Sequence, residues 1–459
     1  MAARPKMNQA ATIPNVAIRA TRAVVPDDLV FSKRQREILL IATVLLVMSA
    51  PLWLWALFFS GPYEYAGALI MVPIIWLINL GLIGRVTRRQ PGLRRLMLVS
   101  FALKVACTGG YIALLYVYYG NGGDATTYFD VGKKWAAFFG AHGSFPIRGE
   151  VWGTSFINSA TGLLVYSLGS SFPTISLLYA AAGFWGAYFF FRAFREAFPS
   201  GRSEFAAMLL FLLPSCQFWT ASIGKDSLMM LSIGMASYGF AKLMASRVLT
   251  GFAYLVPAMF LGSLTRPHVA GMVAIAMLFP YTFAKGQHGL MPVLSKILGI
   301  PLMAGGIAYL VMNATRILRV DSAIGGLERI EKFGTSTMHG GSAFGQGQGT
   351  IAKLLLSPFL MFRPFPWEIP NLLALAATLE ALLILYFLWR VRHELSHQLL
   401  HWRTHPFFMY TVSFGVIYCV VFSLALSNLG LLIRQRTQYT PLLLTLAASA
   451  MVLPRSARQ

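Results

Sequence analysis

The sequence predicts an all-α protein that crosses a membrane many times. Of its 459 residues, 56% are hydrophobic and only 12% are charged, whereas soluble proteins carry about 25% charged residues. Apolar runs of about 20 residues, the length that crosses a bilayer as a helix, recur along the chain, and Lys and Arg gather in the loops between them. These observations predict a polytopic membrane protein with about twelve transmembrane helices and one or two re-entrant or interfacial helices on the outer face.

The first element is a polar, basic segment, residues 1–37, which we expect to be a disordered cytoplasmic tail. The first apolar run, residues 38–60, lacks a small-residue cleavage site and is too long for a signal-peptide core, so we expect it to remain as an anchor. The predicted spans cover residues 38–60, 65–84, 96–119, 172–191, 204–222, 227–246, 251–264, 269–284, 291–313, 369–390, 406–427 and 439–452. They form one transmembrane domain, residues 38–454, before a short cytoplasmic end, residues 455–459.

The orientation follows from five Arg residues that crowd residues 85–95. Positive charge stays on the cytoplasmic side of a membrane. With this loop inside, twelve spans also place the basic loops 192–202, 242–247, 285–288 and 390–403 inside, together with both termini. The net charge of 38 − 16 = +22 is therefore explained by topology and anionic lipid headgroups, and we expect no nucleic-acid partner.

Two apolar segments do not fit as spans. Counting residues 151–171 as a crossing would place Arg192, Arg195 and Arg202 outside, and residues 351–362 are too short and precede a Pro-rich stretch. We interpret both as interfacial or re-entrant pieces of the outer loops, residues 120–171 and 313–368. Irregular backbone at membrane depth lines a cavity or is covered by protein, so a cleft is expected on the outer face.

After the tail the chain has only four Asp residues, and all four fall on the predicted outer face: Asp124, Asp130, Asp226 and Asp321. Charge at the end of a span is costly to desolvate and often marks a site. Asp124 follows a Gly-rich turn, with Tyr128 about one turn later if a helix begins at Ala125. The simpler interpretation of Asp124 is a helix N-cap. The functional one is a carboxylate that accepts a proton from a hydroxyl or holds a divalent cation.

Basic residues on the same face are candidate phosphate ligands. In this interpretation Lys225 contacts phosphate, and Asp226 orients Lys225 or the acceptor. The alternative interpretation is an adjacent-charge turn in which Asp226 caps the next helix. Arg266 could instead snorkel to the interface, and His268 could be satisfied locally. Arg434 and Arg436 point to different sides of any helix, which favours an unwound turn, and they violate the positive-inside preference. Arginine forks match phosphate oxygens.

The Pro-rich segment Arg363-Pro-Phe-Pro-Trp367-Glu368 suits the stiff wall of a cleft. Trp367 is either an interfacial anchor or a plane on which a sugar stacks beside the Glu368 carboxylate. Residues 340–350 are Gly-rich but open no phosphate-loop pattern, and we find no nucleotide-binding motif. The three Cys residues lie inside apolar runs and imply no metal site.

The order of these motifs resembles multi-pass glycosyltransferases of the GT-C type and their polysaccharide-polymerase relatives. The resemblance is carried by GGDATTY, FWTASIGKDS and NLGLLIRQRTQYTP, scattered over about 110–440. The acidic loop here follows the third predicted span rather than the first and lacks a paired acidic motif. The resemblance implies transfer or polymerisation of sugar from a polyprenyl-(di)phosphate-linked donor to a saccharide or other hydroxyl acceptor. It implies a bacterial inner membrane, an outward-facing site and Asp124 and Asp226 as catalytic residues.

A transporter or flippase of lipid-linked saccharide or another anionic substrate is the alternative function. Such a protein is expected to place charged or helix-breaking residues near the middle of the bilayer. Within the predicted spans, Lys104 and Glu380 are the notable charges. The one-sided distribution of the other polar groups favours an enzyme.

Overall fold

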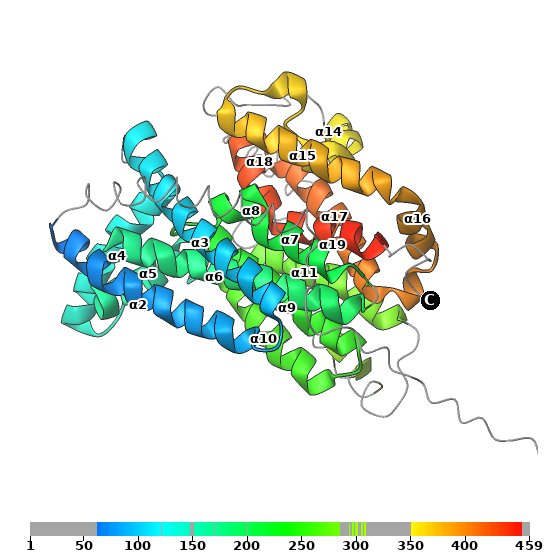
Figure 1. The fold of residues 1–459 in the computed structure, drawn as a ribbon, viewed down its shortest axis with the longest axis horizontal. Coiled ribbons are helices and arrows are strands. Elements are labelled where there is room, and N and C mark those ends of the chain that lie inside the picture. Colours follow the sequence, from blue (N-terminus) through cyan, green and yellow to red (C-terminus); the bar gives the residue numbers. More distant parts are fainter. Residues whose placement is uncertain are drawn as a thin grey trace, which may run out of the picture.

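The computed structural model describes residues 62–120, 122–146, 151–169, 171–199, 201–284 and 350–451, with scattered helical residues between 293 and 308. Every regular element in these ranges is a helix (Figure 1). The helices are α2 (Pro62–Val86), α3 (Pro91–Ala113), η1 (Leu114–Tyr118), α4 (Asp124–His142), α5 (Thr154–Leu168), α6 (Phe172–Ala197), α7 (Ser203–Leu212), α8 (Pro214–Trp219), α9 (Lys225–Met244), α10 (Val248–Thr265), α11 (Pro267–Phe283), α14 (Thr350–Leu356), η2 (Ser357–Phe362), η3 (Pro366–Glu368), α15 (Leu372–Arg390), α16 (Arg392–Leu400), η4 (Trp402–Thr404), α17 (Pro406–Ala425), α18 (Leu429–Gln435), η5 (Arg436–Gln438) and α19 (Thr440–Ala450).

Five helical stretches among these residues are long and apolar enough to cross a membrane. They are Pro91–Tyr118, Phe172–Ala197, Val248–Thr265, Leu372–Arg390 and Pro406–Ala425. The expectation of a helical membrane protein is confirmed at this level. The count of twelve spans stays a prediction, because residues 1–61, most of 291–313 and the end after 451 lie outside the described residues.

The most extensive packing among the described helices is that of α9 against α6 and α10. Gly186 and Gly234 stand where α6 meets α9, and a methyl group on either would collide with the backbone of the other helix. Small residues let helix backbones approach closely where lipid supplies no hydrophobic force between helices. This close contact holds the middle of α9 against α6, and the first turn of α9 carries Lys225 and Asp226.

The segment predicted as one span, residues 204–222, is broken into α7 and α8. Leu213 is extended (φ −65°, ψ 120°), and Pro214 begins the new helix. A residue before proline disfavours the helical region, and proline supplies no N–H for the preceding turn. The carbonyl of Phe211, left without its helical partner, accepts from the Ser100 hydroxyl at 2.7 Å and from the Gln217 amide.

The two charges predicted inside spans hold this break in place. The Glu380 carboxylate of α15 accepts the backbone N–H of Ser215 at 2.9 Å, at the start of α8. Lys104 of α3 donates to the carbonyls of Cys216 and Gln217, at 2.9 and 2.8 Å, near the other end of α8. Helix ends leave N–H and C=O groups unpaired, and such groups are costly inside a membrane. Lys104 and Glu380 therefore stabilise the short helix that leads into the Lys225–Asp226 turn.

Residues 151–171, which we expected to be an interfacial or re-entrant piece, form α5, which packs along α4 as a helical hairpin. A small apolar cluster joins this hairpin to α3 and α6 through Ile112, Phe129, Ile157 and Phe172. In Figure 1, α4 and α5 lie at one side of the molecule and α15 and α16 at the other. The hairpin is thereby attached beside the starts of α6 and α9.

Candidate functional site

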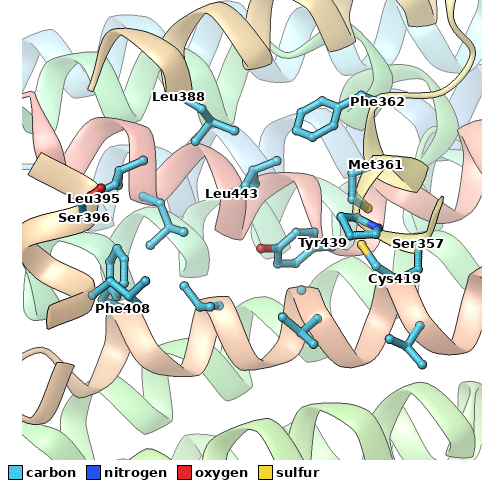
Figure 2. A pocket seen from close by; sticks show the side chains of 17 residues that line it. Ser357, Met361, Phe362, Leu388, Leu395, Ser396, Phe408, Cys419, Tyr439 and Leu443 are labelled. Carbon is cyan, nitrogen blue, oxygen red and sulfur yellow. The ribbon is translucent and has the colours of Figure 1, made fainter. Parts of the chain in front are cut away.

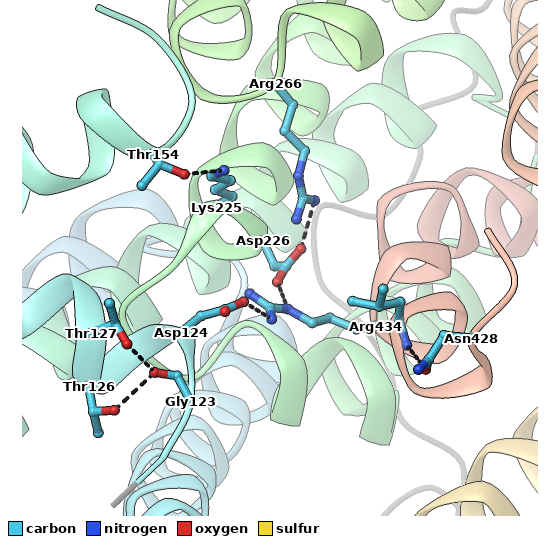
Figure 3. A network of polar contacts seen from close by, with 11 residues as sticks. Gly123, Asp124, Thr126, Thr127, Thr154, Lys225, Asp226, Arg266, Asn428 and Arg434 are labelled. Atoms are coloured by element: carbon cyan, nitrogen blue, oxygen red, sulfur yellow. Dashed lines mark hydrogen bonds and ion pairs between the residues drawn. The ribbon is translucent and has the colours of Figure 1, made fainter. Parts of the chain in front are cut away.

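Four segments far apart in the sequence bring charged side chains together at the start of α9 (Figure 3). At the centre is Asp226, whose Oδ1 accepts from Arg266 Nη1 at 2.7 Å and whose Oδ2 accepts from Arg434 Nε. Arg434 also donates through Nη1 to Asp124 Oδ2 at 2.7 Å. We call Asp124, Lys225, Asp226, Arg266 and Arg434 the charged cluster.

The two carboxylates of the charged cluster differ in burial. The side chain of Asp226 is 3% exposed, whereas that of Asp124 is 58% exposed. Burial alone would raise the pKa of Asp226, but the guanidinium groups of Arg266 and Arg434 outweigh it and hold that pKa below its ordinary value. Asp226 is therefore an ionised, internally satisfied group, while Asp124 presents its carboxylate to solvent.

Asp124 is the first residue of α4 rather than its N-cap. The N-cap is Gly123, whose φ of 134° suits glycine. The hydroxyls of Thr126 and Thr127 donate back to the Gly123 carbonyl at 2.9 and 3.0 Å. Asp226 likewise lies in the first turn of α9, behind Gly224 as N-cap. Both carboxylates are thus directed at arginines instead of capping their own helices. The positive end of each helix dipole also stabilises the negative charge of the carboxylate in its first turn.

Lys225 lies on the other side of Asp226, beside α5. Its ammonium donates to the hydroxyl of Thr154, the first residue of α5, at 3.0 Å. The preceding Gly153 has φ 66° and donates its N–H to the carbonyl of Leu264 at 2.7 Å, which ties α5 to the end of α10 and hence to Arg266. Partial burial and the neighbouring Arg266 lower the pKa of Lys225.

Tyr128 lies one turn after Asp124, as the sequence suggested. Its hydroxyl forms a hydrogen bond with Thr154, and burial followed by the Asp124 charge raises its pKa. Sequence reasoning missed Thr154, which joins Lys225 and Tyr128, and Tyr111, which interacts electrostatically with Arg434, Asp226 and Asp124. The one signal for Tyr111 was an aromatic hydroxyl inside the predicted span 96–119.

His268 lies two residues after Arg266, but its ring contacts α17. It is exposed in the first turn of α11, and its ring meets Phe422 of α17 at 6.4 Å between centroids. Desolvation, together with the charges of Arg266 and Lys225, lowers the pKa of His268, so His268 borders the charged cluster as a neutral ring.

Four other predicted ligands belong to a second group around α15. Arg436 is 1% exposed and donates to the carbonyls of Arg363 and Ala377, at 3.0 and 2.8 Å, while its guanidinium lies 3.3 Å from Glu380. A group buried and bonded in this way is a structural brace, so we reassign Arg436 from phosphate binding. Arg434 and Arg436 do face different sides, with Arg434 in the last turn of α18 and Arg436 at the start of η5.

The Pro-rich segment folds on itself. Arg363 forms a bidentate pair with Glu368, which also accepts the N–H of Phe365 at 3.0 Å. Burial would raise the pKa of Glu368, but Arg363 and the Phe365 N–H lower it. Trp367 is 79% exposed and stacks on Phe365 at 5.0 Å. Of this segment, Pro366 and Trp367 are exposed, and Trp367 presents the larger apolar ring.

An apolar cavity of about 430 Å³ borders the second group (Figure 2). Its lining includes Met361 and Phe362 of η2, Leu395 of α16, Cys419 of α17 and Leu443 of α19. Tyr439, three residues after Arg436, also faces it. An apolar pocket that is open on one side therefore lies next to the segment that follows Arg434.

Among the described residues, no three His, Cys, Asp or Glu side chains group closely enough to hold a metal ion. No protein-family model, characterised protein or solved structure matches this chain.

Proposed function

We propose that this protein is a membrane-embedded glycosyltransferase that takes its sugar from a polyprenyl-(di)phosphate-linked donor. The acceptor is a saccharide or another hydroxyl compound, and the site faces away from the cytoplasm in a bacterial inner membrane. The observation that carries the proposal is the double pairing of Arg434, which joins a buried carboxylate, Asp226, to an exposed one, Asp124.

The arrangement supplies a base and an anion site side by side. Its charges are two carboxylates against Lys225, Arg266 and Arg434, so one positive charge is left over for a phosphate group. Arg434 is anchored through Nε by Asp226, which leaves its outer nitrogens able to exchange Asp124 for a phosphate oxygen. Exchange of that kind would release the Asp124 carboxylate next to the incoming acceptor.

The proposed reaction is a substitution at the anomeric carbon of the donor sugar. The acceptor oxygen attacks this carbon, its proton passes to the Asp124 carboxylate, and the bond to the phosphate oxygen breaks with its electron pair on the leaving group. Negative charge grows on that phosphate in the transition state, where Lys225 and Arg434 act as electrostatic stabilisers. Asp226 is a positioning residue here, which revises its expected catalytic role, because both of its oxygens are already occupied.

The lipid part of the donor also has room in the fold. The apolar cavity bordered by Phe362 and Tyr439 is lined almost entirely by hydrocarbon side chains, which suits an isoprenoid chain. The exposed Trp367 ring remains available for sugar stacking.

The test compares Asp124→Asn with Asp130→Asn in proteoliposomes supplied with polyprenyl-linked sugar. Asp130 lies on the same helix, is also exposed, and pairs only locally with Lys133 at 3.2 Å, so it controls for loss of surface charge. We expect Asp124→Asn to abolish release of the lipid phosphate and Asp130→Asn to retain it. Full turnover by Asp124→Asn would eliminate the base role.

The broken helix α7–α8 is the observation that favours a transporter or flippase instead. Discontinuous helices with intramembrane charges often form transport sites. Here Lys104 and Glu380 are bonded to backbone groups of α8 itself, and they serve the helix rather than a passing substrate. The same assay separates the functions, since a transporter would move the lipid across the bilayer without releasing its phosphate.

A further inference from the structure

A polar cavity of about 350 Å³ lies at the far ends of the helices that carry the charged cluster. Asp226 and Lys242 stand sixteen residues apart on α9, which places them about 24 Å apart along the helix. Arg247 and Arg266 flank the two ends of α10 in the same way. The cavity is therefore distinct from the charged cluster.

The cavity is lined by hydrogen-bond donors and is strongly basic. Its charged lining residues are Arg192, Arg195, Lys242 and Arg247 against one carboxylate, Glu196, a balance of 4 − 1 = +3. Gln90 and Tyr188 add polar groups, and Val86, Leu93 and Phe191 form the apolar part of the wall.

The basic side chains are held in place by the fold. Arg192 donates to the hydroxyls of Tyr188 and Tyr238, both at 2.8 Å, and its guanidinium lies over the Tyr238 ring. Because the Tyr188 oxygen accepts from Arg192, its own O–H is left to donate toward the cavity.

Lys242 and Arg247 are brought to the same carboxylate by a tight turn. Ser246 takes a left-handed conformation (φ 60°), and the N–H of Arg247 donates to the Lys242 carbonyl at 2.9 Å. Lys242 contacts Glu196 at 2.5 Å and Arg247 lies 3.6 Å from it. Because Lys242 and Arg247 share the single carboxylate of Glu196, one positive charge remains, and a bound anion would neutralise it.

We infer that this cavity is a second binding site, one for a phosphate-bearing anion. Several fixed donors around excess positive charge match a phosphate group, which offers acceptor oxygens only. The cavity lies between helix ends of a membrane protein, at loops rich in Lys and Arg, where basic pockets take anionic lipid headgroups. The shared chemistry is the phosphate group, carried by a lipid headgroup or free in solution.

The experiment measures anion binding by the purified full-length protein with two probes, phosphatidylglycerol and inorganic phosphate. Lipid retention is read by native mass spectrometry against phosphatidylcholine, and phosphate binding by equilibrium dialysis. The cavity variants are Gln90→Glu, which adds a carboxylate at constant size, and Arg195→Gln/Arg247→Gln. Arg247 is 63% exposed, so folding should survive its replacement.

The matched control is Arg88→Gln/Arg89→Gln, which removes two charges from the neighbouring exposed loop without touching the cavity. We expect each cavity variant to bind about tenfold more weakly and the control to bind like the wild type. Selective retention of phosphatidylglycerol identifies a lipid headgroup, and saturable binding of phosphate alone identifies a soluble anion. Equal loss in the control, or no anion binding by the wild type, would overturn the inference.

Discussion

Replacement of Asp226 by Asn should cost stability as well as activity. The change is nearly isosteric, but it removes the one charge that faces both Arg266 and Arg434. Breaking a buried ion pair by removing one partner costs about 3–5 kcal/mol. Arg434 keeps its pair with Asp124 in the variant, so we expect the lower end, about 3 kcal/mol at pH 7.

The neighbouring carboxylate gives the contrast. The Asp124 side chain is 58% exposed, and exposed ion pairs contribute about 0–1 kcal/mol. Asp124→Asn should therefore abolish transfer at little cost in stability, whereas Asp226→Asn should lose both. The two variants thus separate the chemical from the positioning role within a single cluster.

The assay is denaturant titration of the full-length protein in mixed micelles, with Asp130→Asn as the control for an exposed carboxylate. A double-mutant cycle with Arg266→Gln then measures the coupling, and we expect at least about 1 kcal/mol of non-additivity. If Asp226→Asn unfolds within about 0.5 kcal/mol of Asp130→Asn, the buried ionic centre deduced here is refuted.

Two further predictions concern pH and the broken helix. The pKa of Lys225 is lowered from its ordinary value of 10.5, so its charge is lost at lower pH than that of an exposed lysine. We therefore expect KM for the donor to rise with pH in the wild type and to stay flat in Lys225→Arg. Identical pH profiles of KM in the two proteins would remove Lys225 from the site. Glu380→Gln leaves buried Arg436 without its carboxylate and weakens the hydrogen bond from the Ser215 N–H. In a denaturant titration we expect the free energy of unfolding to fall by about 3 kcal/mol. An unchanged unfolding midpoint would show that Glu380 does not brace α8.

Acid stability gives a further check on Asp226. Its pKa in the folded protein lies below the ordinary value of 3.8, so its ionisation stabilises the fold above that pH. This contribution is lost as the pH falls through the folded pKa. The unfolding midpoint measured below about pH 4 should therefore decline more steeply in the wild type than in Asp226→Asn. Parallel slopes would contradict a depressed pKa.

The sequence by itself determined the class of fold and the ends of helices where charge collects. Apolar runs exceed the length of a bilayer crossing whatever their neighbours are, and a charged residue at the end of such a run must reach water or a partner. Asp124, Lys225, Asp226, Arg266 and Arg434 were all recognised for this reason. Pro214 also carried the signal for the break that the prediction of one span, residues 204–222, overlooked.

Only the tertiary structure decided which partner each charge finds. Arg434 reaches Asp226 and Asp124 across 208 and 310 positions of sequence, while Arg436, two residues on, turns to Glu380. Residues two apart on a helix point about 200° apart. The spacing in the sequence therefore predicts that these two arginines face different sides, but it does not identify the partner of either one. That choice is made by the crossings of α6, α9 and α10 and by the helix break at Pro214, which set the positions of backbone and charge in three dimensions.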